Sequence, residues 1–219
     1  MKLPFEVELS DKVIAITGAG GVICGEFARA LAACGAKVAL LDINFDAAKK
    51  IADEIGENAV AVRCNCLEVN AAFGKVNFLI NGAGGNNPRA TTDNETAAEA
   101  AQKDFFALDE SGIKFVFDLN ITTAFLVTQV FAEDMLETGG NIINISSMNA
   151  YRPLTKIPAY SAAKAGISRS GSRCILQARG SAAMRSHPDF SSPIRTATFC
   201  STRTARRRRA WVKSWRRRP

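Results

Sequence analysis

The chain has 219 residues, of which 47% are hydrophobic and 22% are charged, enough for one sizeable α/β domain but hardly for a second. The first residues show no long apolar run and no stretch of about 18 uncharged apolar residues occurs, so we expect neither a secretory signal nor a membrane span. Six scattered cysteines and a single histidine, His187, are not spaced as zinc ligands. We expect a cytoplasmic protein with reduced thiols and no metal site.

Charge divides the chain into two parts. Residues 1–168 contain 14 basic and 20 acidic residues, a net charge of −6, whereas residues 169–219 contain 14 basic residues and 1 acidic residue, a net charge of +13. We predict a domain over residues 1–168 and a basic tail over residues 169–219 that does not belong to it.

Short apolar runs alternate with helical patterns through the acidic part. The predicted strands cover residues 12–18, 37–44, 58–65, 75–85 and 139–147. The predicted helices cover residues 25–35, 45–56 and the stretch around 120–136. This order is typical of a doubly wound parallel sheet, a Rossmann-like α/β fold.

Two connections stand out. Only residues 66–74 separate the third and fourth predicted strands, whereas parallel strands need about a dozen residues for a crossover. We therefore expect the crossover helix to be missing or nearly so, with a strained loop or a deletion if these strands are neighbours. Residues 84–104 are polar and turn-rich at their start, and we predict an excursion from the end of the fourth strand.

A glycine-rich turn, TGAGGVICG, follows the first predicted strand. Its glycines would let the backbone approach a pyrophosphate, which the start of the next helix favours; a turn that serves only packing is the alternative, since Ile23 breaks the G-x-G-x-x-G spacing. Asp42 ends the second predicted strand, where a carboxylate can accept hydrogen bonds from an adenosine ribose. It would repel a 2′-phosphate and so favours NAD over NADP, unless it is an ordinary strand-end aspartate.

The stretch ISSMNAYRPLTKIPAYSAAK is the most informative. Tyr160 and Lys164 are four residues apart and share a helix face, where the ammonium can lower the tyrosine pKa. Such a tyrosine can exchange a proton with a substrate oxygen while a hydride moves. Ser147 can hydrogen-bond the same oxygen, and Asn120 lies in a helix, where asparagine is unfavourable without a local role.

These motifs together resemble the short-chain dehydrogenase/reductase family. The resemblance implies that Tyr160 is the general acid/base, that Lys164 lowers its pKa and binds the nicotinamide ribose, that Ser147 orients the substrate and that Asn120 holds a proton-relay water. It also implies the following cofactor contacts: Gly18, Gly20, Gly21, Val22, Ile23, Asp42, Asn65, Cys66, Asn81, Gly82, Ala83, Gly84, Tyr160 and Lys164.

This chain departs from the family at the cofactor turn. The family pattern TGxxxGxG has glycines where Val22 and Cys24 stand, so we expect phosphate contact through Gly18, Gly20 and Gly21. Asn65 stands where the family usually has an aspartate that contacts adenine. Its side-chain oxygen can keep that contact.

Residues 8–168 carry the resemblance, and NGAGGNNP, ATTDNE and SSMNAYRPLTKIPAYSAAK are similar to the branch known as D-mannonate oxidoreductase or fructuronate reductase. That branch interconverts D-fructuronate and D-mannonate with a nicotinamide cofactor. The resemblance implies NAD-dependent hydride transfer on a small sugar acid, no role for a membrane, and a homo-oligomer when the chain is full-length.

Two hypotheses address the basic tail. It is either a basic arm that could bind nucleic acid through phosphate attraction and stacking, or a sequence read in the wrong frame. A one-base shift permits Asn-Ala-Ile-Ala-Pro-Gly-Phe around residues 183–190, where the family has a strand and Pro-Gly. We favour the frame shift, which makes nucleic-acid binding unlikely, leaves the fold C-terminally incomplete and predicts weak folding with little activity. A catalytically silent cofactor-binding domain is the remaining alternative.

Overall fold

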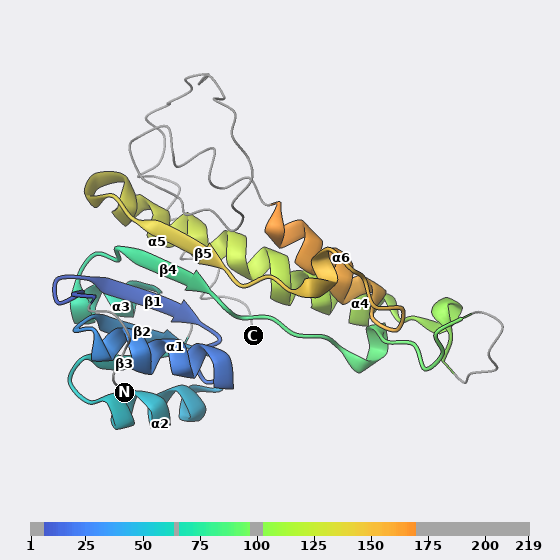
Figure 1. Ribbon diagram of the computed structural model, residues 1–219, viewed down its shortest axis with the longest axis horizontal. Helices are drawn as coiled ribbons and strands as arrows, with labels where there is room; N and C mark the ends of the chain where they lie inside the picture. Colours follow the sequence, from blue (N-terminus) through green and yellow to red (C-terminus); the bar gives the residue numbers. More distant parts are fainter. Residues whose placement is uncertain (1–6, 64–65, 97–102, 170–219) are drawn as a thin grey trace, which may run out of the picture. The chain divides into compact units, whose positions relative to one another are not determined.

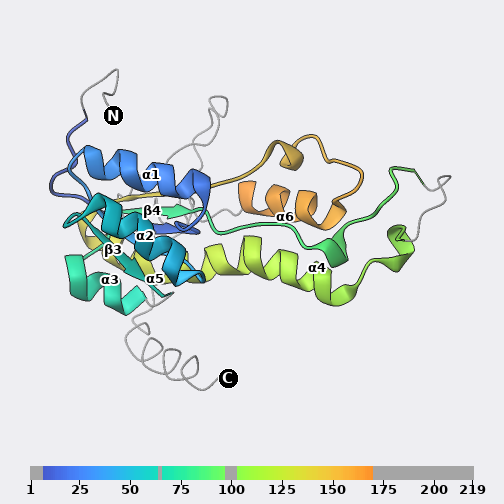
Figure 2. The ribbon, with the colours of Figure 1, turned by 90° about the horizontal axis from the view of Figure 1, so that it is seen from below.

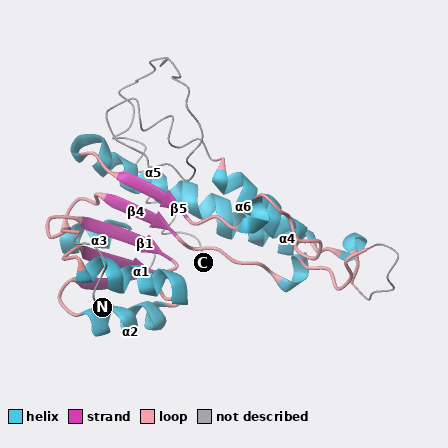
Figure 3. Cartoon of the chain, in the orientation of Figure 1, coloured by secondary structure: helices cyan, strands magenta, loops and turns pink. Residues whose placement is uncertain are grey.

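A five-stranded parallel sheet forms the centre of the chain in the computed structural model, which describes residues 7–63, 66–96 and 103–169. The strand order is β3-β2-β1-β4-β5, and every neighbouring pair is parallel (Figure 3). The strands are β1 (Val13–Thr17), β2 (Lys37–Leu41), β3 (Ala59–Val62), β4 (Phe78–Asn81) and β5 (Asn141–Asn144). The predicted doubly wound parallel sheet is confirmed. Asn65 and the tail from residue 170 lie outside the described residues.

Helices cover both faces of the sheet (Figure 1). On one face, α1 (Val22–Ala33) and α2 (Phe45–Ile55) pack on Ile14, Ile16 and their neighbours. On the other face, α3 (Cys66–Phe73) and α5 (Thr123–Thr138) pack on the alternate residues, including Val13 and Ala15. Because successive strand residues point to opposite faces, one apolar strand supplies both cores.

The expectation about the short crossover was wrong. Helix α3 occupies most of the stretch that we expected to lack a helix, and Val69 on it is fully buried. The strands end earlier than predicted, so residues 63–77 are all available for the connection. The two strands are also not neighbours, because β2 and β1 lie between them. Neither a strained loop nor a deletion is needed to explain this connection.

Polar residues end the strands before the predicted boundaries. The predicted second strand ran to Asn44, but β2 ends at Leu41. Asn44 is instead the N-cap of α2, and its side-chain oxygen accepts a hydrogen bond from the backbone N–H of Ala47 at 3.2 Å. An asparagine that caps a helix cannot continue a strand, since its backbone already turns into the helix.

One long helical run precedes β5. It consists of α4 (Glu110–Phe117), a π-helical turn η3 (Asp118–Thr122) and α5. By length and composition alone the segment Glu110–Leu136 is apolar enough to cross a membrane, which does not by itself contradict the expectation from the sequence. Phe131, Ala132 and Met135 on this run are part of the core beneath the sheet.

Helix α6 (Pro158–Ser168) lies against α4 (Figure 2). The two helices enclose a third cluster of buried residues with the short 3-10 turn η1 (Pro88–Ala90). Ala90, Val116, Ala159 and Ala163 form this cluster. Small residues at its centre let α6 approach the long helical run closely. The helix that carries Tyr160 and Lys164 is thereby joined to the segment that follows β4.

Leu79 gives a test of the sheet core. Its side chain is 0% exposed at the centre of the sheet, whereas Ile143 on the neighbouring β5 is 39% exposed. We expect Leu79→Ala to lower the free energy of unfolding by about 2–5 kcal/mol, because it removes buried methyl groups and leaves a cavity. Ile143→Ala is the matched control and should cost less than about 1 kcal/mol. Denaturant unfolding measures both, and equal losses would contradict this placement of the core.

Candidate functional site

The glycine turn lies between the carboxyl end of β1 and the start of α1. Gly18 has a φ of +69°, a conformation that favours glycine, and Gly21 is the N-cap of α1. No side chain caps this helix start, and no acidic residue lies in its first turn. Val22 and Ile23 follow it and are 85% and 64% exposed. The turn therefore presents an accessible helix N-terminus that favours an anion.

Asp42 connects this turn with the start of α2. One carboxylate oxygen accepts a hydrogen bond from the backbone N–H of Gly20 at 2.9 Å, and the other accepts one from the N–H of Asn44 at 2.8 Å. Asp42 is half-buried and lies directly after β2. The structure thus brings together Asp42 and the glycine turn, which the sequence placed 22 residues apart.

The segment after β4 crosses close to the glycine turn. The Thr17 hydroxyl oxygen accepts hydrogen bonds from the backbone N–H groups of Gly82 and Ala83, each at 3.1 Å. A Cβ atom on Gly18 would lie only 2.9 Å from the backbone nitrogen of Ala83. Asn81 is buried and donates to Thr128 at 3.0 Å and to Asn144 at 2.9 Å. The two bonds to Thr17 hold the segment after β4 in van der Waals contact with the glycine turn.

Asn120 occupies the π-helical turn and is 2% exposed. Its amide nitrogen donates to the carbonyls of Gly85 at 2.7 Å and Val116 at 2.8 Å. Its carbonyl oxygen accepts from the backbone N–H of Gly85 at 3.2 Å. The side chain therefore pairs with the loop after β4 much as a neighbouring strand would. This is the local role that an asparagine inside a helix requires.

Lys164 is the buried cation of the site, with 4% of its surface exposed. Its ammonium donates to the Ile145 carbonyl at 2.9 Å and lies 5.7 Å from the centre of the Tyr160 ring. A Cβ atom on Gly84 would lie 2.8 Å from the Lys164 Nζ and 2.6 Å from the Asn120 Oδ1. Lys164 and Asn120 therefore meet at the loop after β4, and Tyr160 lies beside Lys164. Burial lowers the pKa of Lys164 from its ordinary value, an effect that Cys24 partly opposes.

Ser147 was predicted to end the fifth strand, but β5 ends at Asn144, and the Ser147 side chain instead caps the 3-10 turn η4 (Met148–Ala150). Its hydroxyl accepts a hydrogen bond from the Asn149 N–H at 3.2 Å, and η4 packs against α6. The preceding Ser146 instead bonds to Ser168 on α6. The serine, the tyrosine and the lysine therefore belong to one packed unit.

Two of the expected cofactor contacts are not placed. Asn65 lies outside the described residues, and only the backbone of Cys66 is described, at the first position of α3. Thr17 is the first residue of the glycine motif, and no contact was predicted for it from the sequence. Its hydroxyl accepts two hydrogen bonds, from Gly82 and Ala83, which lie 65 and 66 positions further along the chain. These bonds follow from the pairing of β1 with β4, which no local sequence pattern indicates.

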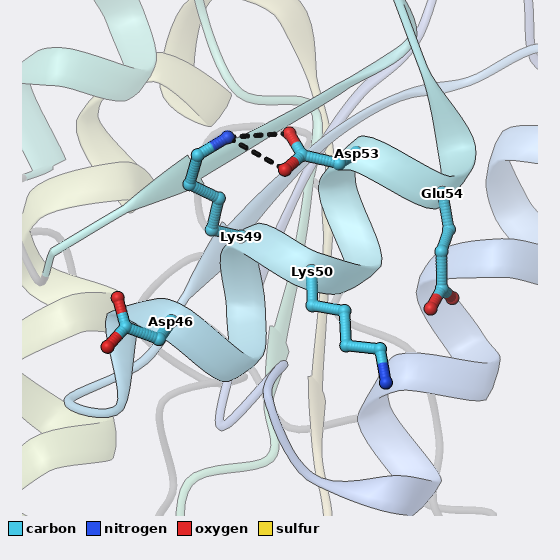
Figure 4. Close-up of a pocket in the computed structure, with 5 residues that line it drawn as sticks. All are labelled: Asp46, Lys49, Lys50, Asp53 and Glu54. Carbon is cyan, nitrogen blue, oxygen red and sulfur yellow. Dashed lines mark hydrogen bonds and ion pairs between the residues drawn. The ribbon is translucent and has the colours of Figure 1, made fainter.

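A shallow depression elsewhere carries no comparable chemistry (Figure 4). It runs along α2 and is lined by Asp46, Lys49, Lys50, Asp53 and Glu54. Lys49 and Asp53, one helical turn apart, form an exposed ion pair at 2.7 Å. Alternating charges of this kind are typical of a solvated helix face. Among the described residues, no group of three or more His, Cys, Asp or Glu side chains could hold a metal ion.

Comparisons with known proteins agree with this geometry. Residues 12–171 match the model of a family described as short chain dehydrogenase. An uncharacterized oxidoreductase of Haemophilus influenzae is 53% identical over 185 residues, which cover 77% of this chain and 65% of the relative. The uncharacterized oxidoreductase UxuB of Bacillus subtilis is 44% identical over 180 residues, which cover 75% of this chain and 65% of the relative. The chain thus spans slightly less than two thirds of the length of these relatives.

A solved structure shows the same arrangement. A proposed D-mannonate oxidoreductase from Haemophilus influenza, crystallised with bound NAD, has 49% sequence identity and a TM-score of 0.75. The match covers 80% of this chain and 69% of that chain.

Gly84 gives a sharp test of the cluster. We expect Gly84→Ala to lower the free energy of unfolding by about 1–3 kcal/mol, because its Cβ would overlap both the Asn120 oxygen and the Lys164 ammonium. Gly85→Ala is the adjacent control, where the nearest atom to a Cβ is 3.6 Å away, and it should cost less than about 1 kcal/mol. Thermal unfolding distinguishes the two. Equal losses would contradict the placement of Asn120 and Lys164.

The burial of Lys164 predicts a dependence of stability on pH. Because its pKa is lowered in the folded chain, the unfolded chain binds more protons between that pKa and the ordinary value of 10.5. Stability contributed by this residue therefore rises with pH across that window. The measurement is the unfolding free energy of the original chain minus that of Lys164→Met, from neutral pH upward. A difference that stays flat or falls would contradict the burial of the ammonium.

Proposed function

The chain belongs to the short chain dehydrogenase family, and on this basis we propose that it transfers a hydride between NAD and a small sugar acid. The observation that carries the proposal is that Lys164 and Asn120 meet at the loop after β4, with Tyr160 beside Lys164 and a glycine turn held by Asp42 close by. Ligands of open parallel α/β sheets bind at the carboxyl ends of the strands, where all these groups lie.

The residues present fit a dinucleotide. The open start of α1 suits a pyrophosphate, and the two carboxylate oxygens of Asp42 keep further acceptor positions for ribose hydroxyls. A carboxylate at this position disfavours the 2′-phosphate of NADP. Lys164 would bind the second ribose with the N–H groups that its bond to Ile145 leaves over. Val22 and Ile23 lie at the exposed start of α1 in this turn, whereas Asn81 ends β4 and Gly82, Ala83 and Gly84 follow it.

The proposed hydride transfer also requires a proton transfer, which the side chains of this protein would carry out. NAD, when bound, would supply the nicotinamide carbon that exchanges a hydride with the substrate carbon. Tyr160 takes the hydroxyl proton during oxidation and gives it back to the carbonyl oxygen during reduction. Ser147 hydrogen-bonds the same oxygen, and the Lys164 ammonium lies beside the tyrosine, 5.7 Å from the centre of its ring. Asn120 would hold the water through which the proton leaves.

The sugar-acid class rests on similarity to one protein. The Haemophilus structure at 49% identity is named for D-mannonate, and the motifs around Ser147 and Tyr160 resemble the same branch. Other expectations stay proposals of the same kind: a domain over residues 1–168, a cytoplasmic location, a homo-oligomer and a basic tail produced by a shifted frame. No feature of the described residues favours nucleic-acid binding over this function.

The deciding experiment measures NADH binding to the 219-residue chain, and D-mannonate oxidation by this chain and by a chain with the shifted frame after residue 168. We expect NADH binding in both and turnover mainly in the second. Tyr160→Phe in that chain should lower kcat by about 10²–10⁴-fold while leaving NADH affinity nearly unchanged. Tyr151→Phe, which changes the only other tyrosine, is the control and should keep full turnover.

Each outcome bears on a different part of the proposal. Failure of both chains to bind NADH would refute the cofactor. NADH binding by the chain with the shifted frame, without turnover of D-mannonate or D-fructuronate, would refute the substrate class. Normal turnover by the 219-residue chain would contradict the impaired activity expected from the frame shift.

A further inference from the structure

We propose that Cys24 is a positioning residue that sets the spacing between the glycine turn and the loop after β4. The inference rests on the proposed cofactor site, because these two segments would hold the two halves of the dinucleotide. Cys24 stands where the family pattern has a glycine, so the contact is a feature of this sequence rather than of the general motif.

The contact is between a thiol and a glycine backbone. Cys24 lies in the first turn of α1 and is 5% exposed. A Cβ atom on Gly82 would lie 2.1 Å from the Cys24 sulfur and 2.8 Å from the Thr17 carbonyl oxygen. Only glycine fits at position 82 while the sulfur occupies this space. The side chain that replaces a family glycine is therefore accommodated by another glycine, 58 positions further along the sequence.

Two opposing contacts hold the loop. The Thr17 hydroxyl draws the N–H groups of Gly82 and Ala83 toward β1 through two hydrogen bonds. The Cys24 sulfur limits how far Gly82 can move toward α1. Two residues later, Gly84 lies against Asn120 and Lys164. A shift of the loop at Gly82 would therefore displace the segment next to the proposed catalytic lysine.

The thiol acts here through its volume. Burial raises the pKa of Cys24, Asp42 raises it further, and Lys164 acts in the opposite direction with a smaller effect. The group is therefore a neutral thiol at physiological pH, and a thiol of this kind behaves as a small hydrophobe.

The first test compares two ligands. We expect Cys24→Ala to weaken NADH binding about tenfold, because the loop can relax into the space left by the sulfur. Binding of ADP should change less than about twofold, since the contacts proposed for that half of the dinucleotide are the glycine turn, Asp42 and Asn65. Cys34→Ala, which changes a cysteine at the opposite end of the same helix, should alter neither affinity. Equal losses for NADH and ADP, or no loss for NADH, would overturn the inference.

The second test needs no cofactor. Gly82→Ala should lower the midpoint of thermal unfolding, because its Cβ would overlap the sulfur, and adding Cys24→Ala should recover part of that loss. Recovery should be incomplete because the contact with the Thr17 carbonyl remains. A double variant no more stable than Gly82→Ala would overturn the contact. If the unsubstituted chain bound no NADH, the proposed function would fail, while this cycle would still decide whether the contact exists.

Discussion

Parallel pairing of β1 with β4 is the constraint on which the site depends. It aligns Thr17 with Asn81 at the carboxyl ends of the two strands, so the backbone segments that follow must leave the sheet side by side. Each segment then needs small residues, because the other backbone occupies the space that side chains would fill. Gly18, Gly82 and Gly84 satisfy this requirement with contacts to different neighbours. The threonine hydroxyl supplies hydrogen bonds where sheet pairing has ended.

The long helical run extends this arrangement to the residues that we propose to be catalytic. The buried Asn120 side chain finds one partner on this run, the Val116 carbonyl one turn back, and needs others for its second N–H and its oxygen. The π-helical turn places Asn120 where it bonds with both the N–H and the carbonyl of Gly85. The loop after β4 is thus held by β1 through Thr17 and by the helix through Asn120. Helix α6 packs on the same run and presents Tyr160 and Lys164 to the held loop.

The burial of Lys164 has an energetic cost that function explains better than folding does. A lysine that is 4% exposed and bonded to one carbonyl is poorly solvated, and burial disfavours its charged form. The hydroxyl groups of a dinucleotide ribose would supply partners for this ammonium. A poorly solvated charged group of this kind is expected at a functional site, where a bound ligand supplies the missing hydrogen-bond partners.

The sequence by itself determined the alternation of strands and helices, the glycine turn and the tyrosine–lysine pair, because each is encoded by residues close together in the chain. Short-range patterns carry hydrophobic period, turn chemistry and helix spacing directly. The strand order was decided only by the tertiary structure, and with it came the ends of the strands, the short helix α3 and the bond from Thr17 to the loop after β4. The role of Cys24 was hidden for the same reason. Its partner is Gly82, far away in the sequence, and only the packing of α1 against the end of β4 brings the sulfur and the glycine together.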